Sequence, residues 1–134
     1  MALRNLAVSG TYEDLHAWRL GMDLIVEVYQ QSLAWPRDER FGLTSQIRRA
    51  AISIPSNIAE GKGRASDREF VKFLYYARGS LYEVQTQVKV ARHLDYLTES
   101  AAQALEKRAA EVGTVLNGLI QAVIPNVDHT LKRG

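Results

Sequence analysis

The side chains that most often carry out acid, base or metal chemistry are sparse in this sequence and poorly matched in spacing. It has three histidines, His16, His93 and His129, and no cysteine, which rules out thiolate chemistry and disulfides. Glu13 and His16 form one Glu-x-x-His pair. A di-iron helical bundle needs that motif on two helices, with inward carboxylates on the others. No second copy exists, so we predict no metal site.

Signatures of nucleophilic catalysis and of phosphate loops are also incomplete. Serines are numerous, but no histidine lies where the sequence would indicate a catalytic triad. The run Gly61-Lys62-Gly63 lacks the spacing and the following Ser or Thr of the Walker pattern. Paired carboxylates are missing from the predicted core positions. We therefore predict no catalytic residues and no cofactor, and a protein that is not an enzyme.

Basic residues gather around the predicted hairpin between the second and third helices. The stretch 37–78 holds nine Lys and Arg against five Asp and Glu, whereas the whole chain has a net charge of only +2. Two helix segments and a basic loop offer a surface to phosphates, which predicts nucleic-acid binding. The alternative is an ordinary solvated surface, partly paired with Glu60, Asp67 and Glu69. The candidate binding residues are Arg48, Arg49, Lys62, Arg64, Arg68 and Lys72.

Four helices are predicted from apolar residues whose spacing alternates between three and four. A period near 3.5 residues is typical of helices that cross at shallow angles, as in four-helix bundles. The predicted core stripes are Leu15, Trp18, Met22, Ile25 and Tyr29; Thr44, Ile47, Ala51, Ile54 and Ile58; Phe70, Phe73, Ala77, Leu81, Val84, Val88 and Ala91; and Leu105, Ala109, Val112, Leu116, Leu119 and Val123.

The starts of three helices carry capping signals. Thr11, with Asp14 three residues later, is predicted to cap the first helix. Ser66 and Glu69 form a capping box at the start of the third helix. Thr98 is the predicted N-cap of the fourth helix.

Prolines and glycines indicate where helices end or bend. The pair Trp35-Pro36 is expected to close the first helix, because the residue before a proline is pushed out of helical geometry. Gly61-Lys62-Gly63 is expected to end the second helix. Pro55 lies inside the second stripe, which keeps its phase, and this predicts one kinked helix. Pro125 is expected to stop the fourth helix.

Together these signals predict a single all-α domain, an antiparallel up-down four-helix bundle over residues 1–134. No apolar run approaches the ~20 residues of a membrane span, so we expect a cytoplasmic protein without a membrane partner. The expected segments are a loose N-terminal arm over 1–11, helices over roughly 12–34, 39–61, 67–96 and 99–124, and a tail over 125–134.

Tyrosines of the third helix lie off its main stripe. Tyr75, Tyr76 and Tyr82 either form the rim of a broad bundle face or contact another subunit, since tyrosine is common at interfaces. The adjacent pair Gly79-Ser80 predicts a close helix crossing, because glycine lets backbones approach. Asn57 and Glu60 are expected to belong to a polar network.

Three segments resemble a known family. They are 12–18 (YEDLHAW), 42–61 (GLTSQIRRAAISIPSNIAEG) and 69–83 (EFVKFLYYARGSLYE). The chain is similar, from about residue 12 to 97, to the four-helix-bundle proteins encoded in intervening sequences of 23S ribosomal RNA genes. The fourth helix is similar to the family only in its general character, without a matching motif. The resemblance implies an up-down bundle and a homopentameric ring, and it supplies no catalytic residues.

Two functions remain open. The accessory variability protein of diversity-generating retroelements is similar to this family in fold and binds nucleic acid, so the resemblance favours an accessory protein that binds structured RNA, or DNA. The alternative is a protein-interaction ring, or scaffold, with no nucleic-acid role. Self-association, RNA or DNA, and another protein are therefore the expected partners.

Overall fold

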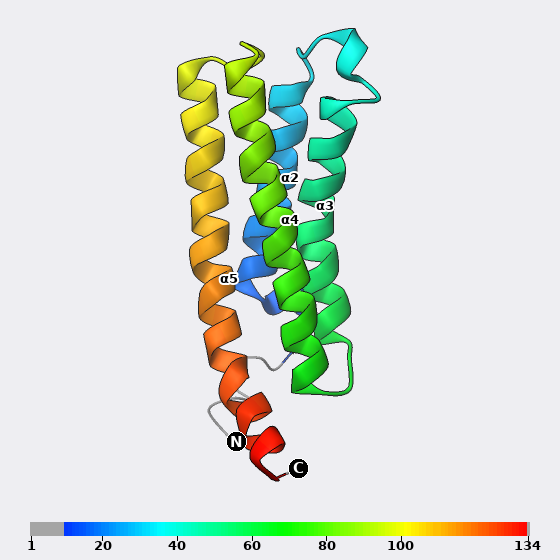
Figure 1. Cartoon of the computed structure of the whole chain (residues 1–134), viewed down its shortest axis with the longest axis vertical. Helices are drawn as coiled ribbons and strands as arrows, with labels where there is room; N and C mark the ends of the chain where they lie inside the picture. Colours follow the sequence, from blue (N-terminus) through cyan, green and yellow to red (C-terminus); the bar gives the residue numbers. More distant parts are fainter. Residues whose placement is uncertain (1–9, 134) are drawn as a thin grey trace.

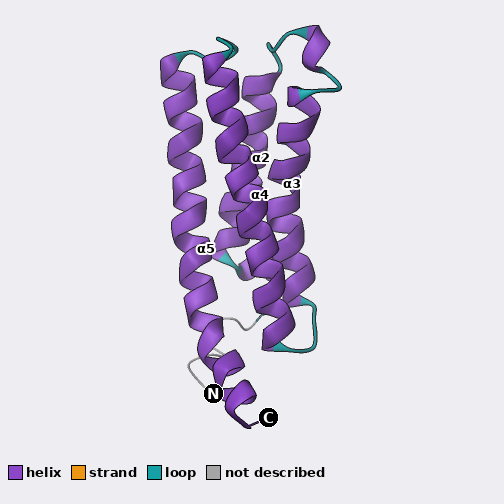
Figure 2. Cartoon of the chain, viewed as in Figure 1, coloured by secondary structure: helices purple, strands orange, loops and turns teal. Residues whose placement is uncertain are grey.

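The chain folds entirely into helices. The computed structural model describes residues 10–133, with side chains over residues 10–127. No strand occurs among these residues, which confirms the predicted all-α class (Figure 2). The described residues form four long helices, with one short 3-10 turn before the first and another between the first two: η1 Tyr12–Asp14, α2 His16–Ser32, η2 Arg37–Glu39, α3 Leu43–Lys62, α4 Asp67–His93 and α5 Glu99–Arg133.

The four long helices lie alongside one another as in a bundle (Figure 1). α2 packs on α3 and α5, and α4 packs on the same two helices. The described parts of α2 and α4 do not contact each other, so these two helices occupy opposite corners. In Figure 1 the loop between α3 and α4 lies at the lower end. The connections from α2 to α3 and from α4 to α5 lie at the upper end.

Two predicted helix starts are confirmed by their hydrogen bonds. The Ser66 Oγ accepts from the Glu69 amide at 3.2 Å, and α4 begins at the next residue. The Thr98 Oγ1 accepts from the Ala101 amide at 3.1 Å, and α5 begins at Glu99. Each cap satisfies an amide that has no partner inside its own helix.

The first helix begins later than predicted. Thr11 precedes only the 3-10 turn η1, where its amide donates to Asp14 Oδ2 at 3.1 Å. Leu15 then has an extended backbone, and α2 starts at His16. Leu15, the residue at this interruption between η1 and α2, is itself buried in the core. The expected arm 1–11 lies mostly outside the described residues.

The prolines behave differently from one another. α3 is one helix through Pro55 and ends at Lys62, where the Gly63 amide donates to the Ala59 carbonyl at 3.2 Å. A kink at Pro55 stays a prediction. Pro125 does not stop α5, which continues through it to Arg133, so the predicted end at 124 was wrong. Ile124 and Val127 pack against the core on either side of this proline, and such contacts offset the lost helical hydrogen bond.

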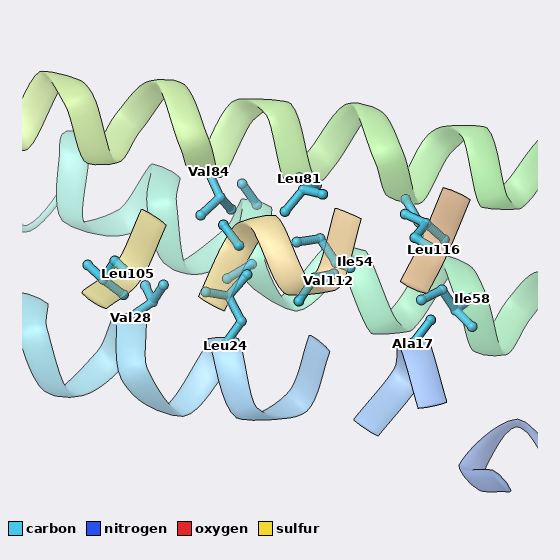
Figure 3. Close-up of a cluster of buried hydrophobic side chains, with 14 of the residues drawn as sticks. Ala17, Leu24, Val28, Ile54, Ile58, Leu81, Val84, Leu105, Val112 and Leu116 are labelled. Carbon is cyan, nitrogen blue, oxygen red and sulfur yellow. The ribbon is translucent and has the colours of Figure 1, made fainter. Parts of the chain in front are cut away.

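The core runs along the middle of the bundle and draws large apolar side chains from all four helices (Figure 3). The predicted stripe of α3 is entirely buried. The stripes of α4 and α5 are buried except for Phe73 and Leu119, which are half-buried. Side chains that converge in Figure 3 include Leu24, Val28, Ile54, Ile58, Leu81, Val84, Leu105, Val112 and Leu116.

The predicted core stripe of the first helix was only partly correct. Leu15 is buried and Trp18 and Ile25 pack against the core, but Met22 is 40% exposed and Tyr29 is 37% exposed. A neighbouring stripe faces the core instead: Ala17, Gly21, Leu24, Val28 and Ser32. The reason lies in the contact with α3, where a Cβ at position 21 would lie 3.3 Å from Pro55 Cδ. Only small residues allow this approach, so the stripe that contains Gly21 turns inward.

Of the pair Gly79-Ser80, Ser80 lies at the contact with α3 and Gly79 does not. A Cβ at position 79 would meet nothing within 4 Å, so that glycine is not needed for packing. Its neighbour Ser80 is buried and accepts a hydrogen bond from Ser53 across the α3–α4 contact. Asn57 Nδ2 donates to the Ser53 carbonyl at 2.8 Å, which extends this polar network as expected.

Candidate interaction surfaces

Groups capable of acid–base or metal chemistry lie apart from one another. Within the described residues, no three carboxylate or histidine side chains gather as they would around a metal ion. His16 is exposed on α2, and Glu13 contributes only its carbonyl to a hydrogen bond with Arg19 Nε, at 2.9 Å. His93 Nδ1 lies 2.8 Å from the Lys89 carbonyl. These contacts are local to single helices or turns.

The predicted basic residues fall into two groups. Lys62, Arg64, Arg68 and Lys72 surround the α3–α4 loop, and we call them the hairpin cluster. Arg48 and Arg49 lie on α3 near its start, so that Arg49 is roughly 20 Å from Lys62 along the helix axis. The six residues therefore do not form one continuous surface.

Cations of the hairpin cluster pair with carboxylates and stack on aromatic rings. Arg64 lies 2.9 Å from Glu60 Oε1, and its guanidinium lies 4.8 Å from the centre of the Phe73 ring. Lys72 lies 3.9 Å from Glu69 Oε2 and 6.0 Å from the Tyr76 ring centre. Both ion pairs are exposed, and such pairs leave the cations accessible to a stronger anion.

The three predicted interface tyrosines are exposed along α4. Tyr75, Tyr76 and Tyr82 are 41%, 50% and 53% exposed, and we call them the tyrosine face. The Arg78 guanidinium lies over the Tyr75 ring at 4.7 Å. Side chains with about half of their surface in water lie outside the core, so they remain candidates both for a rim and for a contact with another subunit.

A second exposed apolar surface runs along α2. We call it the α2 face: Met22, Val26, Tyr29 and Leu33, which are between 37% and 78% exposed and follow one helical stripe. Shallow hollows of about 350 and 400 Å³ lie along it. Its spacing of four, three and four was visible in the sequence, but only packing identified it as the outer stripe.

A polar pocket of about 310 Å³ lies where the chain passes from α2 to α3, and we call it the corner pocket. Arg37, Arg40 and Arg48 line it together with Trp35. The Arg48 Nε donates to Ser32 Oγ at 2.9 Å, and the Arg48 guanidinium lies 4.4 Å from the Tyr29 ring centre. The sequence pattern groups Arg48 with the residues of the hairpin cluster, whereas the structure brings it to this pocket.

A hydrogen-bonded carboxylate links the start of α3 to the α4–α5 loop. Glu39 Oε1 accepts from the Leu43 amide at 3.1 Å, and Glu39 Oε2 accepts from the Tyr96 hydroxyl at 2.8 Å. These two bonds, the Leu43 amide first, lower the pKa of Glu39 below its ordinary 4.5. The same contact raises the pKa of Tyr96 above 10.0.

No helix within residues 10–133 has the combination of length and apolarity that a membrane span requires.

The chain matches the model of one protein family, described as 23S rRNA-intervening sequence protein, over residues 13–118. No curated protein matches it in sequence.

Solved structures include similar folds. One is a crystal structure from Bacteroides thetaiotaomicron, described as a protein of unknown function from the S23 ribosomal protein family. The two chains superpose with a TM-score of 0.70 at 20% identity, over 78% of this chain and 97% of the other. At this identity the similarity supports the bundle fold.

Proposed function

This chain belongs to the 23S rRNA-intervening sequence protein family, and we propose that it is a non-enzymatic bundle that assembles with copies of itself. The proposed subunit is an antiparallel up-down bundle. The proposed assembly is a closed ring, and the family resemblance implies five subunits. The observation that carries the proposal is the presence of two exposed apolar faces, on helices that do not touch each other.

A closed ring needs two different surfaces on each subunit, because each contact is head-to-tail. The α2 face and the tyrosine face meet this requirement, since α2 and α4 occupy opposite corners of the bundle. In the proposed ring, the α2 face of one subunit packs on the tyrosine face of the next. Burying an exposed Val, Leu or Met side chain contributes up to about 1.5–3 kcal/mol, so either face alone offers useful binding energy.

The test compares Val26→Asp on the α2 face with Tyr82→Asp on the tyrosine face by sedimentation velocity. The wild type is expected to sediment as about five copies of the 15.0 kDa chain. Each variant alone is expected to be monomeric, because a buried unpaired carboxylate is costly. Ala104→Asp, on the exposed side of α5, introduces the same charge away from both faces and should leave the ring intact.

Mixing the two variants distinguishes a head-to-tail contact from a symmetric one. Tyr82→Asp keeps its α2 face and Val26→Asp keeps its tyrosine face, so the mixture should form a dimer through one intact interface. A wild type that sediments as a monomer would refute self-assembly. A full ring from either single variant would exclude that face from the interface.

Nucleic-acid binding is the second candidate, and one observation favours it. Arg64 lies over the half-buried Phe73 ring and Lys72 over the exposed Tyr76 ring, so the hairpin cluster combines positive charge with aromatic side chains. Such combinations bind single-stranded or looped nucleic acids. Glu60 and Glu69 offset part of this charge, which is why we place this candidate second.

Fluorescence anisotropy with structured RNA, duplex DNA and single strands, at ~50 to ~200 mM salt, tests this candidate. Replacing Arg64 and Arg68 by Glu should weaken binding and reduce the salt slope by about one for each lost phosphate contact. Lys107→Glu, on the exposed side of α5, is the matched control. Absence of binding at low salt would exclude the candidate and leave the self-assembly proposal untouched.

A further inference from the structure

The corner pocket is a concentration of hydrogen-bond donors. Arg37, Arg40 and Arg48 converge on it, and Thr44 adds a hydroxyl. Within residues 10–127, no carboxylate lies within ion-pair distance of these three guanidiniums. The adjacent turn carries two carboxylates, Asp38 and Glu39, and Glu39 has both oxygens occupied by the Leu43 amide and the Tyr96 hydroxyl. Three guanidiniums against two nearby carboxylates leave a surplus of positive charge at the pocket, which favours an anionic occupant.

One wall of the pocket holds a donor without an acceptor. Trp35 is 6% exposed, and its indole Nε1–H is buried without a hydrogen-bond partner among the described residues. Buried polar groups are nearly always paired, so this N–H is an exception. Its nitrogen is buried and does not open into the pocket, so the Trp35 indole serves here as a nearby reporter of an occupant. The Trp35 ring is itself supported by Tyr96, at 6.0 Å between ring centres.

Arg48 is held in position for binding. Its Nε donates to Ser32 Oγ, and its guanidinium stacks on Tyr29, so the side chain loses little freedom when it binds a ligand. Its two Nη groups have no acceptor among the described residues. A guanidinium with free Nη groups suits the oxygens of a phosphoryl group, which it contacts by two parallel hydrogen bonds.

We propose that the corner pocket binds a phosphate monoester. A volume of about 310 Å³ suits a phosphoryl group with a small substituent. The group could come from a free small molecule or from the 5′-phosphate end of an RNA strand. The lining arginines all belong to one chain. The pocket borders the α2 face, since Leu33 also lines it and Tyr29 lies against Arg48.

The test is a titration of the ¹⁵N-labelled full-length chain followed by NMR. The chain has two tryptophans, so two indole cross-peaks are expected, from Trp18 and Trp35. Adenosine 5′-monophosphate should move the Trp35 peak saturably. Trp18, which packs on Tyr12 near the start of α2, should stay in place. Adenosine, and sodium chloride at matched ionic strength, should have no such effect.

Variants and a second ligand complete the test. Arg40→Gln and Arg48→Gln should each weaken binding by about tenfold or more. Arg49→Gln, the next residue on α3 and absent from the pocket, should leave the affinity unchanged. Because Arg40 is exposed, its variant should fold even if Arg48→Gln does not. Paired 5′-phosphorylated and 5′-hydroxyl RNA oligonucleotides separate the two sources of the phosphoryl group.

An immobile Trp35 peak would overturn the proposal. So would equal losses of affinity in Arg40→Gln and Arg49→Gln, because general surface charge would then explain the binding.

Discussion

At the residue scale, a close approach between α3 and α4 beside their loop depends on Gly61. A Cβ at this position would lie 2.6 Å from Phe73 Cβ and 3.3 Å from the Phe70 carbonyl oxygen. Neither of these atoms belongs to the flexible end of a side chain, so the neighbours cannot rotate away. The hairpin that joins the two helices therefore requires glycine here for steric reasons.

We predict that Gly61→Ala destabilises the protein by about 1–3 kcal/mol, because the two helices must move apart. Gly118→Ala is the matched control, since a Cβ at position 118 would meet nothing within 4 Å. In an exposed helical position the alanine should stabilise by about 0.5–1 kcal/mol. Urea unfolding of both variants measures the difference. Equal stability of the two variants would contradict this account of Gly61.

At the element scale, α2 carries two apolar stripes, and the packing with α3 selects between them. The stripe through Gly21 and Leu24 faces the core, while the stripe through Met22 and Val26 faces outward. Both stripes have helical spacing, so periodicity alone does not indicate which of them faces the core. The contact between Gly21 and Pro55 decides the rotation of α2, because a larger residue would hold the helices apart.

This rotation predicts unequal effects of two neighbouring truncations. Leu24→Ala should cost about 2–5 kcal/mol, because Leu24 is fully buried. Met22→Ala should cost less than about 1 kcal/mol in the isolated subunit, because Met22 is 40% exposed. Chemical denaturation of the two alanine variants at low protein concentration measures both losses of stability. The reverse order would mean that α2 is rotated.

The Glu39–Tyr96 hydrogen bond joins the start of α3 to the α4–α5 loop and predicts a pH dependence. Because the pKa of Glu39 is lowered in the folded chain, its stabilisation is present above 4.5 and is lost as pH falls through the lowered value. Tyr96 has the opposite sign, since its raised pKa gives stability below 10.0 that is lost as pH rises through the raised value.

The wild type should therefore lose stability on acidification below pH 4.5, and Glu39→Gln should lose less stability over the same range. Thermal melting measures this difference. Tyr96→Phe should flatten the decrease above pH 10.0. Asp38→Asn, beside Glu39 in the same turn, is the control and should keep the acid dependence of the wild type. If Glu39→Gln and wild type melt in parallel from pH 7 to pH 3, the hydrogen bond does not contribute.

At the scale of the whole molecule, seven of the twelve exposed large apolar side chains among the described residues lie on the α2 face and the tyrosine face, at opposite corners of the bundle. The other five, Tyr12, Phe41, Ile52, Val90 and Leu94, lie outside both faces. Grouped apolar surface on a small domain indicates an interaction site. Self-assembly would couple the stability of the fold to protein concentration by mass action.

We therefore predict that the melting temperature of the wild type rises over a hundredfold increase in protein concentration, because the ring binds folded subunits only. The melting temperature of Val26→Asp should not change over the same range. Differential scanning calorimetry provides the measurement. A wild-type melting temperature that does not change with concentration would argue that the folded chain is stable on its own.

The sequence by itself determined the helices and the family. Apolar spacing and the caps at Ser66 and Thr98 act locally, so they identify four helices and three of the four core stripes without tertiary contacts. The segment 42–61 is long and specific enough to indicate the family, which the match over residues 13–118 confirms. Pro125 is an exception, because Ile124 and Val127 pack on the core and carry α5 past it.

Only the tertiary structure decided which surfaces are available. The rotation of α2 depends on its contact with Pro55, which lies on another helix, so local spacing could not separate the inner stripe from the α2 face. The six predicted basic residues looked continuous in the sequence, but the length of α3 separates Arg48 and Arg49 from the hairpin cluster. The corner pocket arises where Arg37, Arg40 and Arg48 come together. Proximity in space depends on how helices pack, which the order of residues does not contain.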